Sequence, residues 1–168
     1  MIRRLELVIT IVFLLSKFCI SLKVKNLILY DGVCKFCNTW VGVLLKLDRS
    51  GKFKYAALQS PSGKKALSLC NRSVNDLSSI VYIDEELDLN KTPIDSVKKS
   101  NIKFYTKSEA IIQILKKLGI PIQFVTYFLP RILKDGFYDI VAQNRYSLMG
   151  KYDECKLYDI EYEDRFLK

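Results

Sequence analysis

The chain of 168 residues contains no histidine. Ser-His-Asp triads, Cys-His hydrolases, histidine general bases and histidine metal sites are therefore excluded. Any chemistry must come from cysteine, carboxylates, tyrosine, lysine or arginine. The sequence also lacks internal repeats and any apolar run of the roughly 20 residues that a membrane-spanning helix needs. With 49% hydrophobic and 12% aromatic residues, it predicts one globular domain with a packed core.

The formal net charge is +9, but the cationic residues are not clustered. Lysines are spread through nearly every segment and gather only in short pairs such as Lys64-Lys65 and Lys98-Lys99. A nucleic-acid interface would instead collect them in a stripe interleaved with aromatic side chains. We therefore expect a solvated, lysine-rich surface and no nucleic-acid partner.

Residues 1–22 have the order of features that is typical of a secretory signal peptide. Arg3 and Arg4 precede the apolar stretch 7–15, which leads into small residues ahead of a candidate cleavage point. The alternatives are an uncleaved hydrophobic anchor, which would hold the protein on a membrane, and an ordinary buried helix. A signal peptide predicts a location in the secretory pathway or in an organelle reached through it. Residues 23–168 are expected to form a single domain.

The pattern of apolar residues predicts an alternating order of strands and helices. Short apolar runs predict four strands, at 27–30, 53–58, 80–83 and 102–105. Apolar residues at helical spacing predict five helices, at 34–51, 60–70, 106–118, 122–129 and 132–146. The third of these opens with the capping box Thr106-Lys107-Ser108-Glu109. The polar loop 84–101 is expected to be exposed and mobile, and the acidic stretch from Tyr152 is expected to be a surface tail.

This order of elements is that of a thioredoxin-like α/β fold. A parallel strand–helix–strand unit comes first, and an antiparallel strand pair and a helix follow it. We therefore expect a central mixed four-stranded sheet flanked by helices, with extra helices toward the C-terminus.

The chain has five cysteines, and the close pair Cys34 and Cys37 lies where the first strand gives way to a helix. At the start of a helix, unpaired backbone N–H groups and the positive end of the helix dipole favour a thiolate. Cys34 is thus the natural nucleophile. Cys37, three residues on, is the natural resolving thiol, and its place on the apolar face of the helix predicts that it is the more buried of the two. Asp31, just before the dithiol, is a candidate for moving protons or a simple turn residue.

Two other interpretations of the pair are inert structural thiols and half of a zinc site. A closed zinc site needs about four ligands. Without histidine it would have to recruit Cys70 and Cys155, neither of which has a cysteine close by in the sequence. We expect redox chemistry, no bound metal, and no cofactor beyond a redox-active disulfide between Cys34 and Cys37.

The segment Tyr30–Asn38 resembles the Asp-Gly-x-Cys-x-x-Cys signature of the DCC family of thiol–disulfide oxidoreductases. Further matches to that family occur in the same order along the chain, at Asp48-Arg49, Phe53, Leu58-Gln59-Ser60, Ser108-Glu109-Ala110, 135–138, Asn144-Arg145-Tyr146, Gly150-Lys151 and Cys155. The resemblance implies a thioredoxin-like fold, disulfide reductase activity on a protein or small-molecule disulfide, and Cys34 and Cys37 as the redox pair with Asp31 as the signature acid. Cys155 is a candidate additional resolving thiol.

The chain departs from thioredoxin itself before the third strand, where thioredoxins carry a cis-proline that guides the substrate backbone. Ser78-Ser79 stand there instead, which argues against peptide docking of the thioredoxin kind. Four polar residues are candidates to line the site in its place, or else to cap helices and bond internally: Gln59, Ser60, Asn144 and Arg145. The alternative function is a redox-sensing binding or assembly module without turnover, favoured by the missing proline and by the aromatic-rich C-terminal helices.

Overall fold

A computed structural model describes residues 23–90, 102–122, 127–155 and 160–168. The predicted signal peptide or anchor at residues 1–22 lies outside the described residues, as do part of the predicted loop 84–101 and half of the predicted helix 122–129.

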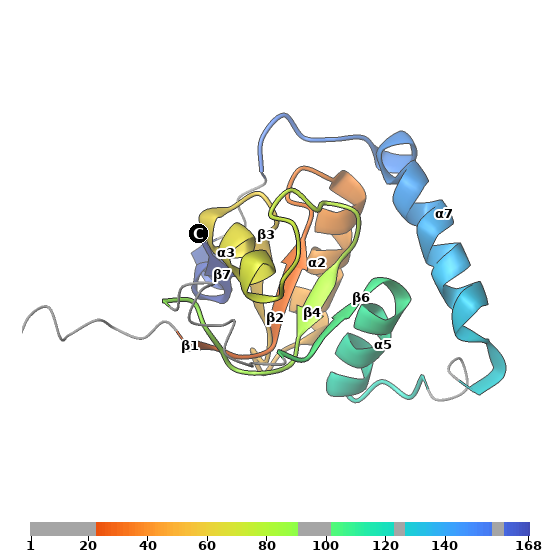
Figure 1. Cartoon of the computed structure of the whole chain (residues 1–168), viewed down its shortest axis with the longest axis horizontal. Coiled ribbons are helices and arrows are strands. Elements are labelled where there is room, and N and C mark those ends of the chain that lie inside the picture. Colours follow the sequence, from red (N-terminus) through yellow and green to blue (C-terminus); the bar gives the residue numbers. More distant parts are fainter. Residues whose placement is uncertain (1–22, 91–101, 123–126, 156–159) are drawn as a thin grey trace, which may run out of the picture.

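A five-stranded mixed sheet forms the centre of the molecule, in the order β6-β4-β2-β3-β7 (Figure 1). The parallel neighbours are β2 with β3 and β3 with β7, and the antiparallel neighbours are β2 with β4 and β4 with β6. A separate antiparallel pair joins β1 to β5. The strands are β1 (Lys23–Val24), β2 (Leu27–Tyr30), β3 (Lys54–Ala57), β4 (Val81–Ile83), β5 (Leu87–Asp88), β6 (Phe104–Thr106) and β7 (Phe166–Leu167).

Helices cover both faces of this sheet because its central strand is apolar on both. All four residues of β2 are buried, and successive side chains of a strand point to opposite faces. Leu27 and Leu29 pack in the cluster that contains α3, whereas Ile28 and Tyr30 pack in the cluster that contains α2 and α5. The helices are α2 (Lys35–Leu47), α3 (Pro61–Leu69), α5 (Lys107–Lys117), α7 (Arg131–Met149) and the 3-10 helix η1 (Ile160–Arg165).

The predicted thioredoxin-like α/β fold is confirmed, and its central sheet has one strand more than expected. The C-terminal residues were predicted to form a surface tail, but β7 extends the sheet beside β3, where Phe166 pairs with Tyr55 and Leu167 with Ala56. A two-residue strand is too short to show an alternating pattern, and partly buried Phe166 and Leu167 pack against the core from this edge.

Two local expectations are wrong within the described residues. The first part of the loop 84–101 is not uniformly exposed, because β5 pairs with β1 and Leu87 and Leu89 are buried. Thr106 precedes α5 as predicted but makes no side-chain capping hydrogen bond. Lys107 there has a φ of 53°, and the Ser108 hydroxyl instead donates a hydrogen bond to Asp135 of α7.

The long helix α7 does not cover the sheet directly. It lies at the side of the molecule and contacts α2 and α5 (Figure 1). It has 19 residues, none of them buried. This placement puts one side of α7 next to the end of β2 and the start of α2, which is where the dithiol lies.

Candidate active site

Cys34 is the N-cap residue of α2. Its Sγ atom accepts a hydrogen bond from the backbone N–H of Cys37 at 3.3 Å. Extended torsion angles at Cys34, φ −78° and ψ 117°, turn the chain from β2 into the helix. The dithiol therefore lies at the predicted strand-to-helix junction, with the first sulfur atom among the N–H groups that the first turn of a helix leaves unpaired.

The two thiols differ in exposure in the opposite sense to the prediction. Cys34 is 0% exposed, whereas Cys37 is only half-buried. The prediction that Cys37 is the more buried thiol is therefore wrong. The prediction rested on the apolar face of the local helix and took no account of a segment near the other end of the chain that pairs with Cys34.

That segment, residues 150–152, follows α7 directly and is called the strap below. Lys151 of the strap forms an antiparallel bridge with Cys34. Two backbone hydrogen bonds flank this bridge, from the Lys35 N–H to the Gly150 carbonyl at 3.3 Å and from the Tyr152 N–H to the Val33 carbonyl at 2.8 Å. The strap thus pairs along the backbone at the start of the dithiol motif, directly beside the buried Cys34.

The carboxylate of Asp31, at the end of β2, is buried and fully engaged. Its side chain is 3% exposed. It accepts four hydrogen bonds: from Gln59 Nε2 at 2.7 Å, from the Val33 N–H at 3.3 Å, from Arg145 Nη2 at 3.2 Å, and from the Tyr146 hydroxyl. A buried carboxylate needs such compensation, because removal of its hydration shell is otherwise costly.

Arg145 brings three separate parts of the chain together at this point. Besides Asp31, it donates hydrogen bonds to the carbonyl of Leu77, at 3.0 Å, and to the carbonyl of Ala142, at 2.7 Å. Its guanidinium also lies 4.5 Å from the centre of the Tyr146 ring. Arg145 was selected from the sequence and Tyr146 was not, although Tyr146 stands in the same family-like triplet.

A second residue that was not selected from the sequence, Asn38, holds the backbone of the motif in place. Asn38 is buried in α2, and its Nδ2 atom donates to the carbonyls of Gly32 and Cys34, both at 2.8 Å. The available signal was an amide residue directly after the second cysteine, at the start of an otherwise apolar helix face.

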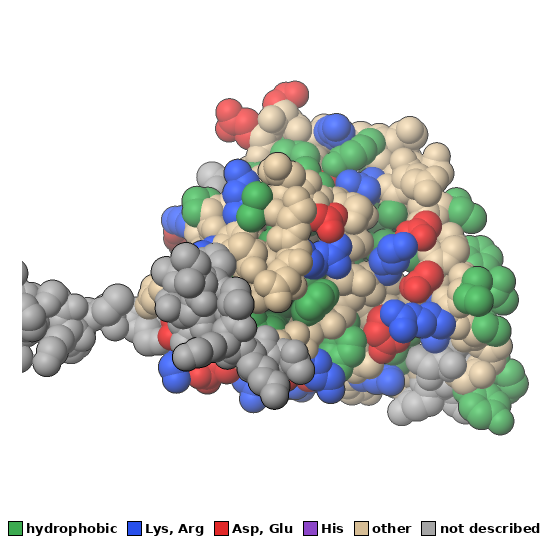
Figure 2. Space-filling model, viewed as in Figure 1, with side chains coloured by type: hydrophobic (Ala, Val, Ile, Leu, Met, Phe, Trp, Pro, Cys, Tyr) green, Lys and Arg blue, Asp and Glu red, His purple; other side chains and the backbone are tan. Residues whose placement is uncertain are grey.

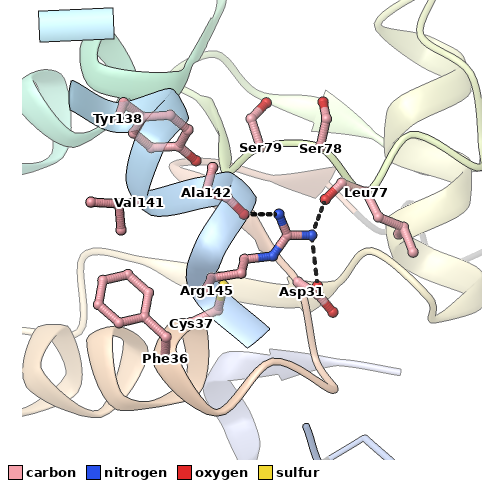
Figure 3. Close-up of a pocket in the computed structure, with 10 residues that line it drawn as sticks. All are labelled: Asp31, Phe36, Cys37, Leu77, Ser78, Ser79, Tyr138, Val141, Ala142 and Arg145. Carbon is pink, nitrogen blue, oxygen red and sulfur yellow. Dashed lines mark hydrogen bonds and ion pairs between the residues drawn. The ribbon is translucent and has the colours of Figure 1, made fainter. Parts of the chain in front are cut away.

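Cys37, unlike Cys34, lines a pocket of about 50 Å³ between α2, α7 and the segment before β4 (Figure 3). In Figure 3 the ring of Phe36 and the guanidinium of Arg145 lie on the two sides of the Cys37 side chain. The wall is completed mainly by Asp31, Leu77, Tyr138 and Val141. A space of this size holds a few water molecules or one side chain.

The surroundings of Cys37 keep its thiol protonated. Burial raises the pKa of Cys37 well above its usual range, and the neighbouring Cys34 sulfur and the Asp31 carboxylate raise it further. The Arg145 guanidinium lowers the pKa of Cys37, but its effect is the smallest of these. Cys37 therefore needs a proton acceptor before it can attack a disulfide.

Ser78 and Ser79, which stand in place of the thioredoxin proline, line the same pocket. The backbone N–H of the next residue, Ile80, donates to the Tyr138 hydroxyl at 2.9 Å. Tyr138 is itself half-buried, and burial raises its pKa to about 12. The backbone beside β4 is thus already engaged by a side chain of α7.

Comparison with known proteins assigns the family. A model of the family described as DCC1-like thiol-disulfide oxidoreductase matches residues 28–151. The chain belongs to this family. It is 34% identical over 136 residues to a chloroplastic DCC family protein of Arabidopsis thaliana, covering 79% of this chain and 70% of that protein. It is 32% identical over 145 residues to the uncharacterized protein YuxK of Bacillus subtilis, covering 85% of this chain and 94% of that protein. No solved structure matches the chain.

The family resemblance stated from the sequence is confirmed, and with it a general role in thiol–disulfide oxidoreduction. The match begins inside β2 and ends at Lys151, so it includes the dithiol motif, α7 and most of the strap. Gly150 and Lys151 of the strap therefore belong to the matched region of this DCC1-like protein.

The remaining polar residues selected from the sequence lie in different places. Gln59 lies at the site and bonds Asp31 and the Gly32 N–H. Ser60 caps α3, where its Oγ atom accepts from the Gly63 N–H at 3.1 Å. Asn144 is exposed and donates to the Ile140 carbonyl of its own helix at 2.8 Å, so the structure does not bring it to the site.

Cys155 lies next to the Asp-Gly turn of the DCC1-like motif. Its exposed Sγ atom is 3.9 Å from Gln59 Oε1 and 2.6 Å from the position that a Cβ atom on Gly32 would take. Burial and the Asp31 carboxylate raise the pKa of Cys155 above its usual value. Its role as an additional resolving thiol stays a prediction. Cys70 is buried in the core cluster beside α3.

The orientation of α7 is unusual for a surface helix, which normally buries its apolar side. The half-buried positions of α7 carry mainly polar residues, including Asp135, Asp139 and Arg145, and Lys107 of α5 pairs with Asp139 at 2.8 Å. Its exposed apolar side chains form a stripe along the edge of the molecule (Figure 2); they are Ile132, Leu133, Phe137, Ile140, Val141, Leu148 and Met149. Within the described residues, no helix combines the length and the apolar composition that a membrane-spanning helix requires.

Proposed function

We propose that this DCC1-like protein is a thiol–disulfide oxidoreductase of the protein-disulfide reductase type, with Cys34 as nucleophile and Cys37 as resolving thiol. The observation that carries the proposal is the capping geometry, in which Cys34 Sγ accepts the Cys37 N–H at the first turn of α2. The sulfur lies there at the N-terminal end of α2, beside N–H groups that the first turn of a helix leaves unpaired. No cofactor is needed beyond the disulfide that the two cysteines form.

The exchange takes two steps. The Cys34 thiolate attacks a substrate disulfide, which forms a mixed disulfide and releases the first substrate sulfur as a thiolate. Cys37 then loses its proton and attacks the Cys34 sulfur, which forms the Cys34–Cys37 disulfide and releases the second substrate sulfur. Two electrons pass from the protein to the substrate, and the two thiol protons pass to the released sulfurs. An external thiol or dithiol reductant returns the protein to its starting form.

Asp31 is the group best placed to take the proton from Cys37. Both side chains line the same pocket, and the Asp31 charge acts directly on Cys37. Arg145 and Tyr146 hold the Asp31 carboxylate in a fixed orientation. Asp31 therefore acts as the proton acceptor in the second step, and Arg145 and Tyr146 act as positioning residues.

The substrate is a protein or small-molecule disulfide, and the protein works in an organelle or in the secretory pathway. The N-terminal features of a signal peptide support this location, as does the chloroplastic name of the Arabidopsis relative. An uncleaved N-terminal segment would place the same activity on a membrane.

The test is reduction of insulin and of glutathione disulfide by the purified full chain. We expect Cys34→Ser to abolish turnover and Asp31→Asn to slow it, whereas Cys70→Ala, which changes a thiol of the core, should keep most of it. Turnover that survives in Cys34→Ser would refute the proposal.

A second candidate function is a redox-sensing binding module without turnover. The complete burial of Cys34 favours it, because a nucleophile that is 0% exposed cannot meet a substrate in this state. Cys37→Ser separates the two functions. An exchange enzyme accumulates mixed disulfides through Cys34 in this variant, and a binding module does not.

A further inference from the structure

We propose that the backbone of Val33–Lys35 is a docking edge for an extended polypeptide that places its cysteine directly opposite Cys34, and that the strap occupies this edge in the resting protein. This inference rests on the proposed function and assigns its substrate class and the atoms that recognise the substrate. It also assigns a role to the strap, which holds the edge closed.

The contacts of the strap show how an extended chain binds there. The hydrogen bonds that join the strap to the edge, from the Lys35 N–H and to the Val33 carbonyl, are made entirely by backbone atoms. Lys151, which lies opposite Cys34, is itself exposed. A polypeptide of different sequence can make the same hydrogen bonds, as in other cases of strand addition to an exposed backbone edge.

The register of the bridge fits disulfide exchange. Because the hydrogen bonds are made by the residues on either side of Cys34 and Lys151, these two form a non-hydrogen-bonded antiparallel pair. The Cα atoms of such a pair are about 4.5 Å apart, which lies within the range of about 4.4–6.8 Å that a disulfide bridges. A substrate cysteine in the place of Lys151 is therefore at bonding distance from the nucleophile.

In the resting protein, the docking edge beside Cys34 is already occupied. Cys34 is completely buried, and the strap already takes both hydrogen-bonding groups of the edge, the Lys35 N–H and the Val33 carbonyl. An extended substrate must therefore displace the strap before the exchange. At the segment before β4, the Ile80 N–H is already bonded to the Tyr138 hydroxyl. The exchange is then the balanced reaction described above, with the substrate backbone held by the Val33 carbonyl and the Lys35 N–H.

The test measures mixed-disulfide formation by the full chain carrying Cys37→Ser. The probes are blocked five-residue peptides with a central cysteine, activated as the mixed disulfide with thionitrobenzoate, whose release reports the rate. One peptide is unmodified, one is N-methylated at the residue after the cysteine, and one is N-methylated at the cysteine itself. The activated disulfide of cysteamine, which has no peptide backbone, is the fourth probe.

Methylation after the cysteine removes the N–H that takes the place of the Tyr152 N–H, and we expect the rate to fall about three- to tenfold, as for loss of one hydrogen bond. The peptide methylated at the cysteine is the matched control, because the N–H of the residue opposite Cys34 points away from the edge. We expect this peptide to react within about twofold of the rate of the unmodified peptide. Cysteamine should react more slowly than the unmodified peptide.

Equal rates for the two methylated peptides would overturn the proposal while leaving Cys34 as nucleophile. No reaction with any probe would overturn the proposed function as well.

A second measurement tests the strap. Tyr152→Pro removes the strap N–H that bonds Val33, whereas Tyr152→Ala removes the ring and keeps the N–H. We expect Tyr152→Pro to react with the unmodified peptide several times faster than Tyr152→Ala, because a weakened strap competes less with the substrate. Equal rates in the two variants would show that the strap does not occupy the docking edge.

Discussion

The Nη2 atom of Arg145 lies 3.2 Å from the Oδ2 atom of Asp31, although the two residues are 114 positions apart in the sequence. Their side chains are only 14% and 3% exposed. This ion pair joins α7 to the end of β2 and sets the charge beside Cys37. Its loss should therefore change both the stability of the fold and the chemistry of the dithiol.

Arg145→Met should lower the free energy of unfolding by about 2–4 kcal/mol, because it leaves the buried Asp31 carboxylate without its cationic partner. The matched control on the same helix is Arg131→Met. Arg131 pairs with Asp135 at 3.6 Å but is 75% exposed, so we expect a change below about 0.5 kcal/mol. Urea denaturation of both variants measures the difference. Equal effects would contradict a stabilising role of the buried pair.

The contrast between Asp31 and Arg145 also shows what could be predicted from the sequence. Strand β2 and helix α2 were predicted because a short apolar run and a helical spacing of apolar residues are both local patterns. Asp31 and Cys37 were selected because they stand within one short motif. The partners of Asp31 come from a distant helix whose polar side faces inward, and no local pattern shows which side of a mixed helix packs.

The prediction that Cys34 is the more exposed thiol was wrong for the same reason, because its pairing partner is also distant in the sequence. From the motif alone, the first thiol at the start of a helix is expected to be the accessible one. The strap beside it pairs through backbone atoms, and backbone pairing leaves little trace in side-chain identity. Strand β7 was missed for a related reason, since two residues at the end of the chain carry too short a pattern.

Asn38→Ala should loosen the dithiol motif, because it removes the two hydrogen bonds to the carbonyls of Gly32 and Cys34. These acceptors are buried, and we expect a loss of about 1–3 kcal/mol of stability and slower mixed-disulfide formation by Cys34. Asn144→Ala is the control, since Asn144 bonds a carbonyl of its own helix in the same i−4 relationship but is exposed. Chemical denaturation and thiol-exchange kinetics test both variants; a neutral Asn38→Ala would contradict the assigned role.

Gly32→Ala tests the close packing around the Asp-Gly turn. A Cβ atom there would lie 2.9 Å from Ala57 Cβ and 2.6 Å from Cys155 Sγ. We expect a loss of about 1–3 kcal/mol from this overpacking, part of which Cys155→Ala should restore. Gly136→Ala, in α7, meets nothing within 4 Å and should instead raise stability by about 0.5–1 kcal/mol. Thermal denaturation separates the two outcomes, and a neutral Gly32→Ala would show that the turn has more room.

The free energy of unfolding should fall with rising pH once the Cys70 thiol of the unfolded chain begins to ionise. Burial raises the pKa of Cys70 to about 12, whereas a thiol in the unfolded chain ionises near pH 8.5. Between these values the unfolded state binds fewer protons than the folded state, so stability that is present below about pH 8.5 is lost as the pH rises. Cys70→Ala should make the loss between pH 9 and 10 shallower by up to about 1.4 kcal/mol. Denaturation at a series of pH values measures this slope, and an unchanged slope would contradict the burial of the Cys70 thiol.

Lys151→Cys, combined with Cys37→Ser, tests the position of the strap directly. The antiparallel bridge places residue 151 opposite Cys34, at the Cα separation of about 4.5 Å that such pairs have and that a disulfide bridges. We expect mild oxidation to join the new cysteine to Cys34 in nearly all molecules and to block the reaction of Cys34 with activated disulfides. The control is Ser147→Cys in the same background, an exposed position of α7 that lies outside the bridge to Cys34. Peptide mapping by mass spectrometry under non-reducing conditions identifies the linkage. Pairing of the new cysteine with Cys155 instead, or equal crosslinking from position 147, would show that the strap does not hold Lys151 over the nucleophile.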